Sequence, residues 1–148
     1  MPAALQALRE EGGLTVNPLL GFYLANTTLL VCHEIDSAYW KEWDFFAGLF
    51  GQPPLPEGDL SGLTGFLIFH IPAVLAVLYG LLEVQKGTSR GNWFSLGVCG
   101  CGLLAFGIHM YGLGCGRPEF RSTISVAILI GILLASIGQL LFTIRRMR

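Results

Sequence analysis

Four long apolar stretches, separated by short polar connections, dominate the pattern of the chain. They are expected to run from about Leu19 to Trp40, Gly62 to Val84, Asn92 to Gly114 and Ser122 to Ile144. Each is about as long as the ~20 residues with which an α-helix crosses a bilayer. The stretch from Ser125 to Leu134 has no charge and lacks the polar face of a soluble bundle helix. The pattern predicts an all-α fold, a polytopic integral membrane four-helix bundle, with residues 1–148 as a single membrane domain.

The composition of the chain agrees with a membrane protein. Of its 148 residues, 53% are hydrophobic and 13% are charged, whereas soluble domains average roughly 25% charged residues. Nine lysines and arginines stand against ten acidic residues, so the chain has no basic surface that could neutralise a nucleic-acid backbone. We therefore exclude nucleic acid as a partner and expect the lipid bilayer to be the main one.

The basic residues predict the orientation of the chain, because four spans put both termini on the same side of the membrane. Six basic residues lie on that side and three on the other, namely Arg9, Lys86, Arg90, Arg145, Arg146 and Arg148 against Lys41, Arg117 and Arg121. Since lysine and arginine are in excess on the cytoplasmic side, we expect both termini in the cytoplasm. On the outer side, the aromatic run from Tyr39 to Phe46 is typical of an interfacial belt.

Small residues recur at every fourth position of the fourth stretch. They are Thr123, Ala127, Gly131 and Ala135. Small side chains allow a neighbouring helix backbone to approach closely. We expect this face to pack against another helix, either within the chain or in a second copy, so a homo-oligomer is one of two open predictions.

The three histidines fall in three different stretches but at similar depths. With a rise of ~1.5 Å per residue, His33 lies ~5 Å, His70 ~5 Å and His109 ~9 Å from the midpoint of its span, each toward the outer leaflet. Two carboxylates follow His33 closely: Asp36 shares its helix face, whereas Glu34 is turned by about 100°. The sequence therefore predicts one polar layer in the outer half of the bundle.

This layer has the side chains of a metal site. Ionisable residues at such depth are costly and face inward toward partners, and zinc accepts imidazole and carboxylate ligands while leaving one position for water. We predict a divalent metal, zinc, bound by His33, Asp36, His70 and His109, with Glu34 or Asp36 as the catalytic base. The expected activity is hydrolytic or oxidative, on a lipid-like substrate. Which of the two carboxylates faces the histidines stays open.

Two alternatives also stay open. Facing histidines on antiparallel helices can hold a haem iron, although the chain has no attachment motif for haem. A non-enzymatic membrane protein, either an ion or proton transport element or an accessory subunit, would use the histidines for polar packing or proton handling. Whether the chain is an enzyme is therefore open, because His33-Glu34-Ile35-Asp36 lacks the second histidine of the His-Glu-x-x-His zinc motif.

Two runs of the sequence resemble a small bacterial integral-membrane family of unknown function. They are His-Glu-Ile-Asp-Ser-Ala-Tyr-Trp-Lys-Glu-Trp, from His33 to Trp43, and Phe-His-Ile-Pro, from Phe69 to Pro72. The resemblance covers roughly the first two spans and implies a bacterial inner membrane but no reaction. The four-span outline is also similar to that of membrane glutathione transferases and quinone-reducing membrane oxidoreductases. The chain lacks the arginine and glutamate pattern of the former and the Cys-x-x-Cys of the latter.

Overall fold

The computed structural model describes residues 17–56, 58–117 and 120–148, which confirm the all-α prediction. Within these ranges the chain forms no strand and five α-helices, α2 (Pro18–Tyr39), α3 (Glu42–Leu49), α4 (Ser61–Lys86), α5 (Ser89–Gly114) and α6 (Thr123–Met147). The ends of the four long helices lie within three residues of the expected spans. Arg9, which contributed to the predicted orientation, lies outside the described residues.

Three of the long helices, α4, α5 and α6, are long and apolar enough to cross a membrane. The helix expected as the first span, α2, is not among them, although it has 22 residues. Its hydropathy is lowered by Asn26, His33 and the carboxylates Glu34 and Asp36. The polar groups that suggested a functional site therefore weaken the membrane signal of the same helix.

Local capping signals mark the starts of α2 and α5 and the end of α4. The side chain of Asn17 accepts a hydrogen bond from the Leu19 N–H at the start of α2, and Thr88 accepts one from the Gly91 N–H, 3.0 Å away, at the start of α5. Gly87 ends α4 with a φ of 77°, a left-handed conformation that costs glycine little. These three helix ends therefore have a local cause in the sequence.

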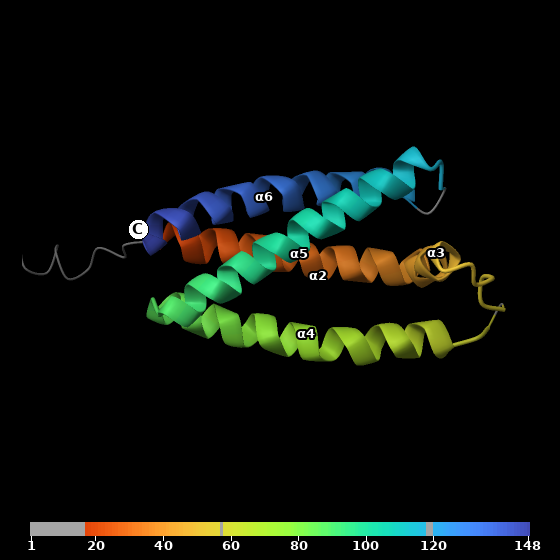
Figure 1. The fold of residues 1–148 in the computed structure, drawn as a ribbon, viewed down its shortest axis with the longest axis horizontal. Helices are drawn as coiled ribbons and strands as arrows, with labels where there is room; N and C mark the ends of the chain where they lie inside the picture. The colour runs from red at the N-terminus through yellow and green to blue at the C-terminus, as the bar shows by residue number, and fades with distance from the viewer. Residues whose placement is uncertain (1–16, 57, 118–119) are drawn as a thin grey trace, which may run out of the picture.

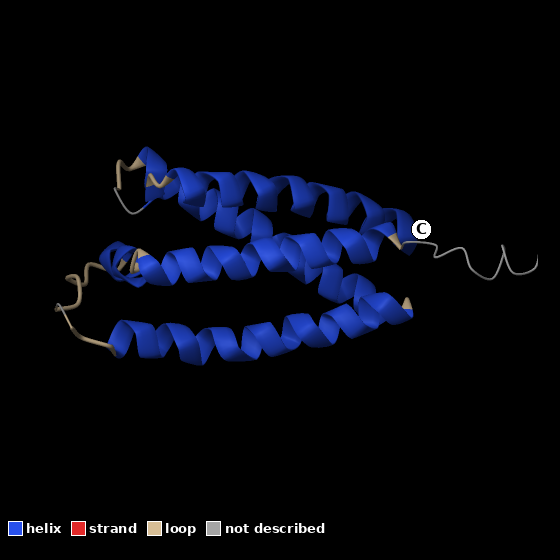
Figure 2. Cartoon of the chain, turned by 180° about the vertical axis from the view of Figure 1, so that it is seen from behind, coloured by secondary structure: helices blue, strands red, loops and turns tan. Residues whose placement is uncertain are grey.

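The arrangement of the helices is that of an irregular bundle. Figure 1 shows α2, α4 and α6 running along the long axis, while α5 crosses α2 diagonally from the side of α4 to the side of α6; the view from behind in Figure 2 agrees. Gly102 lies at a close contact of α5 with α2 and α6, since a Cβ there would touch Ser136 and Asn26. The C-terminus and the α4–α5 turn lie at one end of the bundle, and α3 lies at the other.

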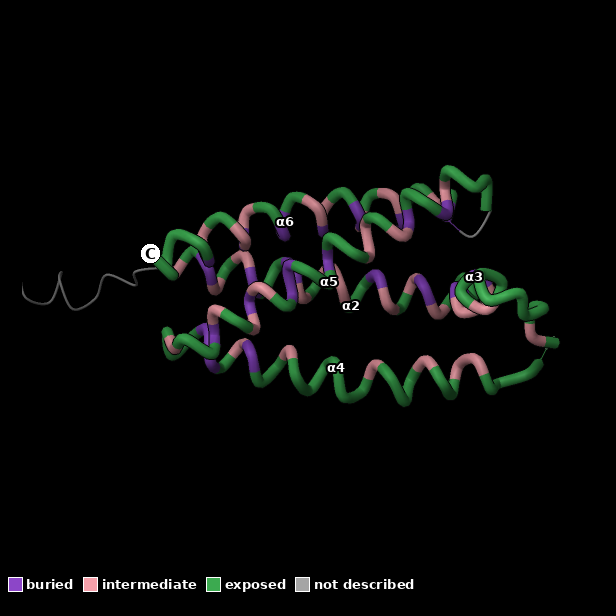
Figure 3. The backbone as a smooth tube through the Cα atoms, in the orientation of Figure 1, coloured by how far each residue is buried: buried purple, intermediate pink, exposed green. Residues whose placement is uncertain are grey.

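The buried residues are concentrated in α2, α5 and α6 (Figure 3). In α4 only Gly80, Glu83 and Val84 are buried, all near the α4–α5 turn. The remaining length of α4 is mostly exposed and apolar, as expected of a helix that faces lipid. The buried core therefore encloses α4 only near the α4–α5 turn, and at the other end Trp43 of α3 lies against Gly62 and Phe66.

Some of the small residues of the fourth stretch pack against another helix of the same chain. A Cβ on Gly131 would lie 3.2 Å from the side chain of Leu29 on α2, and Ala135 is buried. Ala127 and Thr123 are exposed. Part of this face thus packs on α2, whereas contact with a second copy of the chain stays a prediction.

Candidate functional site

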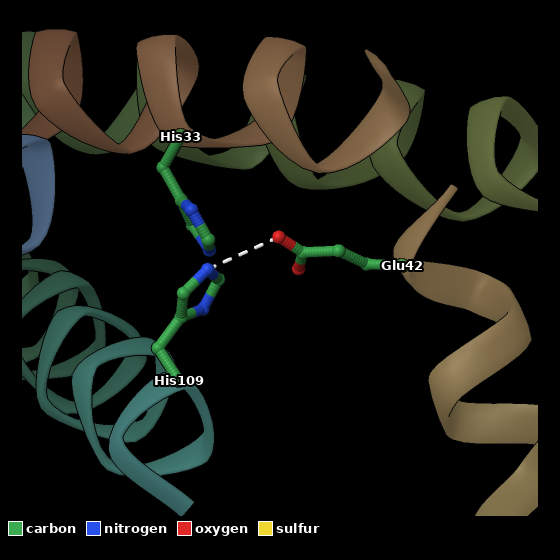
Figure 4. A group of neighbouring side chains, drawn as sticks. All are labelled: His33, Glu42 and His109. Carbon is green, nitrogen blue, oxygen red and sulfur yellow. Dashed lines mark ion pairs between the residues drawn. The ribbon is translucent and has the colours of Figure 1, made fainter. Parts of the chain in front are cut away.

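Three buried side chains from three different helices meet at the end of the bundle that carries α3. They are His33 of α2, Glu42 of α3 and His109 of α5, which are 6%, 4% and 2% exposed. Figure 4 shows the two imidazole rings and the carboxylate pointing toward one another. One potential ligand atom from each residue lies within 4.8 Å of the other two. We call these three residues the His/Glu cluster.

The contacts within the His/Glu cluster leave two polar atoms without a hydrogen bond. His109 Nε2 and Glu42 Oε1 lie 3.1 Å apart as an ion pair, but they are not aligned for a hydrogen bond, and neither has another partner among the described residues. The second carboxylate oxygen, Oε2, accepts a hydrogen bond of 2.9 Å from Ser37. The His33 and His109 rings meet edge to face, with centroids 4.8 Å apart.

A reversal of the chain brings Glu42 to this position. After α2 ends at Tyr39, Lys41 adopts a left-handed conformation with a φ of 54°, and α3 begins at the next residue. Ser37, in the last turn of α2, then lies close enough to bond Glu42 and is 3.5 Å from His33 Nδ1. The turn thus folds the start of α3 back onto the end of α2.

A second pair of ionisable side chains lies near the His/Glu cluster. Glu34 Oε2 and His70 Nε2 are 2.7 Å apart, and both side chains are partly exposed. His70 Nδ1 donates to the carbonyl oxygen of Phe66, 2.7 Å away, because a carbonyl can only accept. Nδ1 therefore faces the backbone as a donor, and Nε2 faces the Glu34 carboxylate. The contact with His70 fixes the position of Glu34 at the cavity.

One cavity of about 490 Å³ connects the two groups. Its polar lining comes from all three histidines and three further side chains: His33, Glu34, Ser37, Glu42, His70 and His109. The rest of its wall is mainly aromatic and aliphatic, from α3, α4 and α5. The three histidines therefore line one cavity, as their similar depths predict.

The predicted site residues divide into those that face the cavity and one that does not. His33 and His109 meet directly, and His70 is paired with Glu34. Asp36 instead accepts a hydrogen bond from Ser125 of α6 and does not line the cavity. Of the two carboxylates considered from the sequence, Glu34 lines the cavity with the histidines and Asp36 does not.

Sequence reasoning missed Glu42 as a site residue. It lies nine positions after His33, beyond the end of α2, in a run that was interpreted as an interfacial belt. The run forms α3 instead, with Phe45 buried against Phe120. The signal in the sequence that could have identified Glu42 is its charge, because an interfacial aromatic belt does not require a carboxylate.

The donors of the His/Glu cluster fit a metal ion. Two ligand atoms on a tetrahedral zinc lie ~3.3 Å apart, close to the 3.1 Å between His109 Nε2 and Glu42 Oε1. A buried polar atom without a partner is costly, and an ion would satisfy both atoms at once. One ring nitrogen of His33 lies within 4.8 Å of the ligand atoms of the other two residues. Glu42 thus takes the carboxylate position for which the sequence suggested Asp36.

The chain matches a family model over residues 19–146, and that model is described as a family of unknown function (DUF6713). No curated protein and no solved structure matches the chain.

Proposed function

We propose a function from the site itself, because the chain belongs to DUF6713, a family of unknown function. In this proposal the protein is an integral membrane protein that binds one divalent metal ion, zinc, through His33, Glu42 and His109. The observation that carries this proposal is the pair of buried atoms, Glu42 Oε1 and His109 Nε2, that face each other with no hydrogen-bond partner among the described residues.

The protein has four spans in this proposal, with α2 as the first. The 22 residues of α2 reach about 33 Å, and the helix lies beside α6 and α5. Five of the eight basic residues of the described chain lie at the end opposite α3, namely Lys86, Arg90, Arg145, Arg146 and Arg148. By the positive-inside rule that end and both termini are cytoplasmic. The His/Glu cluster then lies in the outer half of the membrane, which in this proposal is a bacterial inner membrane.

The chemistry best supported is hydrolysis of an acyl lipid. A divalent metal in the cluster would supply a polarised water and a Lewis acid for a carbonyl, and zinc has no redox chemistry of its own. Glu34 lines the same cavity and is oriented by His70. In that hydrolysis Glu34 would take the proton of the attacking water and pass it to the leaving oxygen or nitrogen as the acyl bond breaks.

Elemental analysis of protein purified in mild detergent without chelators tests the metal site. We expect about one zinc per chain, and a loss of more than about 100-fold in zinc affinity in Glu42→Gln. The matched control is Asp44→Asn, a carboxylate of the same helix whose Oδ1 accepts a hydrogen bond from the Leu55 N–H. It should keep its zinc.

Two outcomes overturn the proposal: wild-type protein that binds no divalent metal even after incubation with zinc, and Glu42→Gln protein with the zinc content of wild type. A Soret band in the absorption spectrum would favour haem. Metal-free protein whose histidine variants alter proton flux in liposomes would favour the transport alternative.

A further inference from the structure

We infer that the cavity beside the His/Glu cluster admits an uncharged, single-chain acyl lipid, an ester or amide, which enters sideways from the bilayer between α4 and α5. This inference names the substrate class of the proposed hydrolysis and rests on it for the reaction. Binding of the lipid itself depends only on the cavity.

The outer half of α4 contacts the rest of the protein around the cavity, through the Glu34–His70 pair and the packing of Trp43 on Phe66, and most of its other residues are exposed. All buried residues of α4 lie near the α4–α5 turn, and α5 leaves α4 there to cross toward α6 (Figure 1). Two cavity-lining residues on these helices, Phe69 of α4 and Leu104 of α5, are 73% and 64% exposed. In a membrane such residues border lipid, so the opening faces acyl chains.

The size and walls of the cavity suit one acyl chain with a small head. Its volume of about 490 Å³ lies within the roughly 300–1,000 Å³ of typical small-ligand sites. The walls are apolar, with Trp43, Phe46, Phe66 and Ile108 among them, and the polar groups gather at the His/Glu cluster and the Glu34–His70 pair. An amphiphile would place its chain along the walls and its carbonyl at the polar groups.

The charges around the cavity disfavour an anionic head group. Two carboxylates, Glu34 and Glu42, line the cavity, and no lysine or arginine does. Arg117 instead lies over the ring of Phe45, 5.8 Å from its centroid, and is not part of the lining. With a divalent ion bound, the two carboxylates balance its charge. A phosphate head would therefore find no counter-charge, whereas a neutral ester or amide needs none.

Photo-crosslinking with a diazirine-bearing monoacylglycerol tests the inference on the full chain in mixed micelles. We expect cross-links on cavity-lining residues of α4 and α5, located by peptide mass spectrometry. Monooleoylglycerol should compete at least about tenfold better than oleoyl phosphate, because an unpaired like charge is costly at a binding site. Equal competition by the two lipids would overturn the neutral head group.

A matched pair of tryptophan substitutions tests the location. Ala105 lines the cavity, whereas Ala73 is exposed on α4 and does not line it. We expect Ala105→Trp to lower the cross-link yield in the cavity about tenfold by filling it, and Ala73→Trp to leave the yield unchanged. Equal yields in the two variants would overturn the inference, and the competition on wild-type protein stays decisive if Ala105→Trp fails to fold.

The same preparations distinguish the two proposals. Metal-free protein that still shows competition by neutral lipid leaves the binding inference standing while the metal proposal fails. Protein with one zinc per chain and cross-links spread evenly over its lipid-facing surface leaves the metal proposal standing while the binding inference fails.

Discussion

The two halves of the bundle both bury polar side chains, but these side chains differ in their charge and in their hydrogen bonding. Between the middle of the bundle and the α4–α5 turn, five neutral residues join α2, α5 and α6 and are completely buried: Asn26, Ser95, Ser136, Gln139 and Thr143. Gln139 Oε1 accepts from Asn26 at 2.8 Å, and its Nε2 donates to Ser95 Oγ at 2.9 Å. Near the end that carries α3, the His/Glu cluster is buried and ionisable, and Glu42 Oε1 and His109 Nε2 lack hydrogen bonds.

This difference separates a structural network from a reactive one. Amides and hydroxyls that satisfy one another can only hold helices together, and in membranes each such bond contributes about 0.6 kcal/mol on average. Imidazoles and a carboxylate with unused lone pairs are instead free to bind something else. The neutral network therefore joins the helices, the proposed metal binding belongs to the His/Glu cluster, and four substitutions test this division.

The largest expected effect is that of His33→Gln, which removes a ligand from the His/Glu cluster while keeping a polar side chain. We expect zinc affinity to fall by more than about 100-fold, measured by titration against a competing chelator. The free energy of unfolding of the metal-free protein should change by less than about 0.5 kcal/mol. A variant with the zinc affinity of wild type would remove His33 from the site.

The reciprocal substitution is Gln139→Leu. It removes the hydrogen bonds of Gln139 to Asn26 and Ser95, each of which keeps one other side-chain partner, so we expect the free energy of unfolding in mixed micelles to fall by about 1–2 kcal/mol. Zinc affinity should stay within about twofold, because the neutral network does not contact the His/Glu cluster. Loss of zinc in folded Gln139→Leu protein would break the division between the two halves.

Ser37→Ala should have a smaller effect on zinc than loss of a ligand. Ser37 holds Oε2 of Glu42 and so orients the carboxylate, and loss of such a partner lowers metal affinity by about tenfold. Ser37→Thr keeps the hydroxyl and should restore most of the affinity. Equal affinities in the alanine variant and wild type would mean that Ser37 does not orient Glu42.

The smallest expected effect is that of Asp36→Asn. The asparagine oxygen can still accept the hydrogen bond from Ser125 of α6, and the side chain does not line the cavity. We expect zinc affinity within about twofold of wild type in the same chelator titration. A tenfold loss would return Asp36 to the metal site as the sequence pattern suggested.

The sequence was sufficient for the long helices and for the meeting of the histidines. Apolar length defines the spans, and a constant rise per residue gives the depths of His33, His70 and His109. It was insufficient for helix rotation and for local reversals. Asp36 shares a face with His33 but bonds α6, and Glu42 reaches the cluster through the conformation of a single residue, Lys41.

The origin of the His/Glu cluster in three separate segments has a consequence for biosynthesis. His33 and Glu42 come from the first part of the chain, and His109 arrives only with α5. Because a ribosome delivers these segments in order, the complete ligand set cannot exist until α5 has entered the membrane and docked on α2. In the proposed metalloprotein, ion capture therefore marks a late stage of assembly, after most of the chain has been inserted.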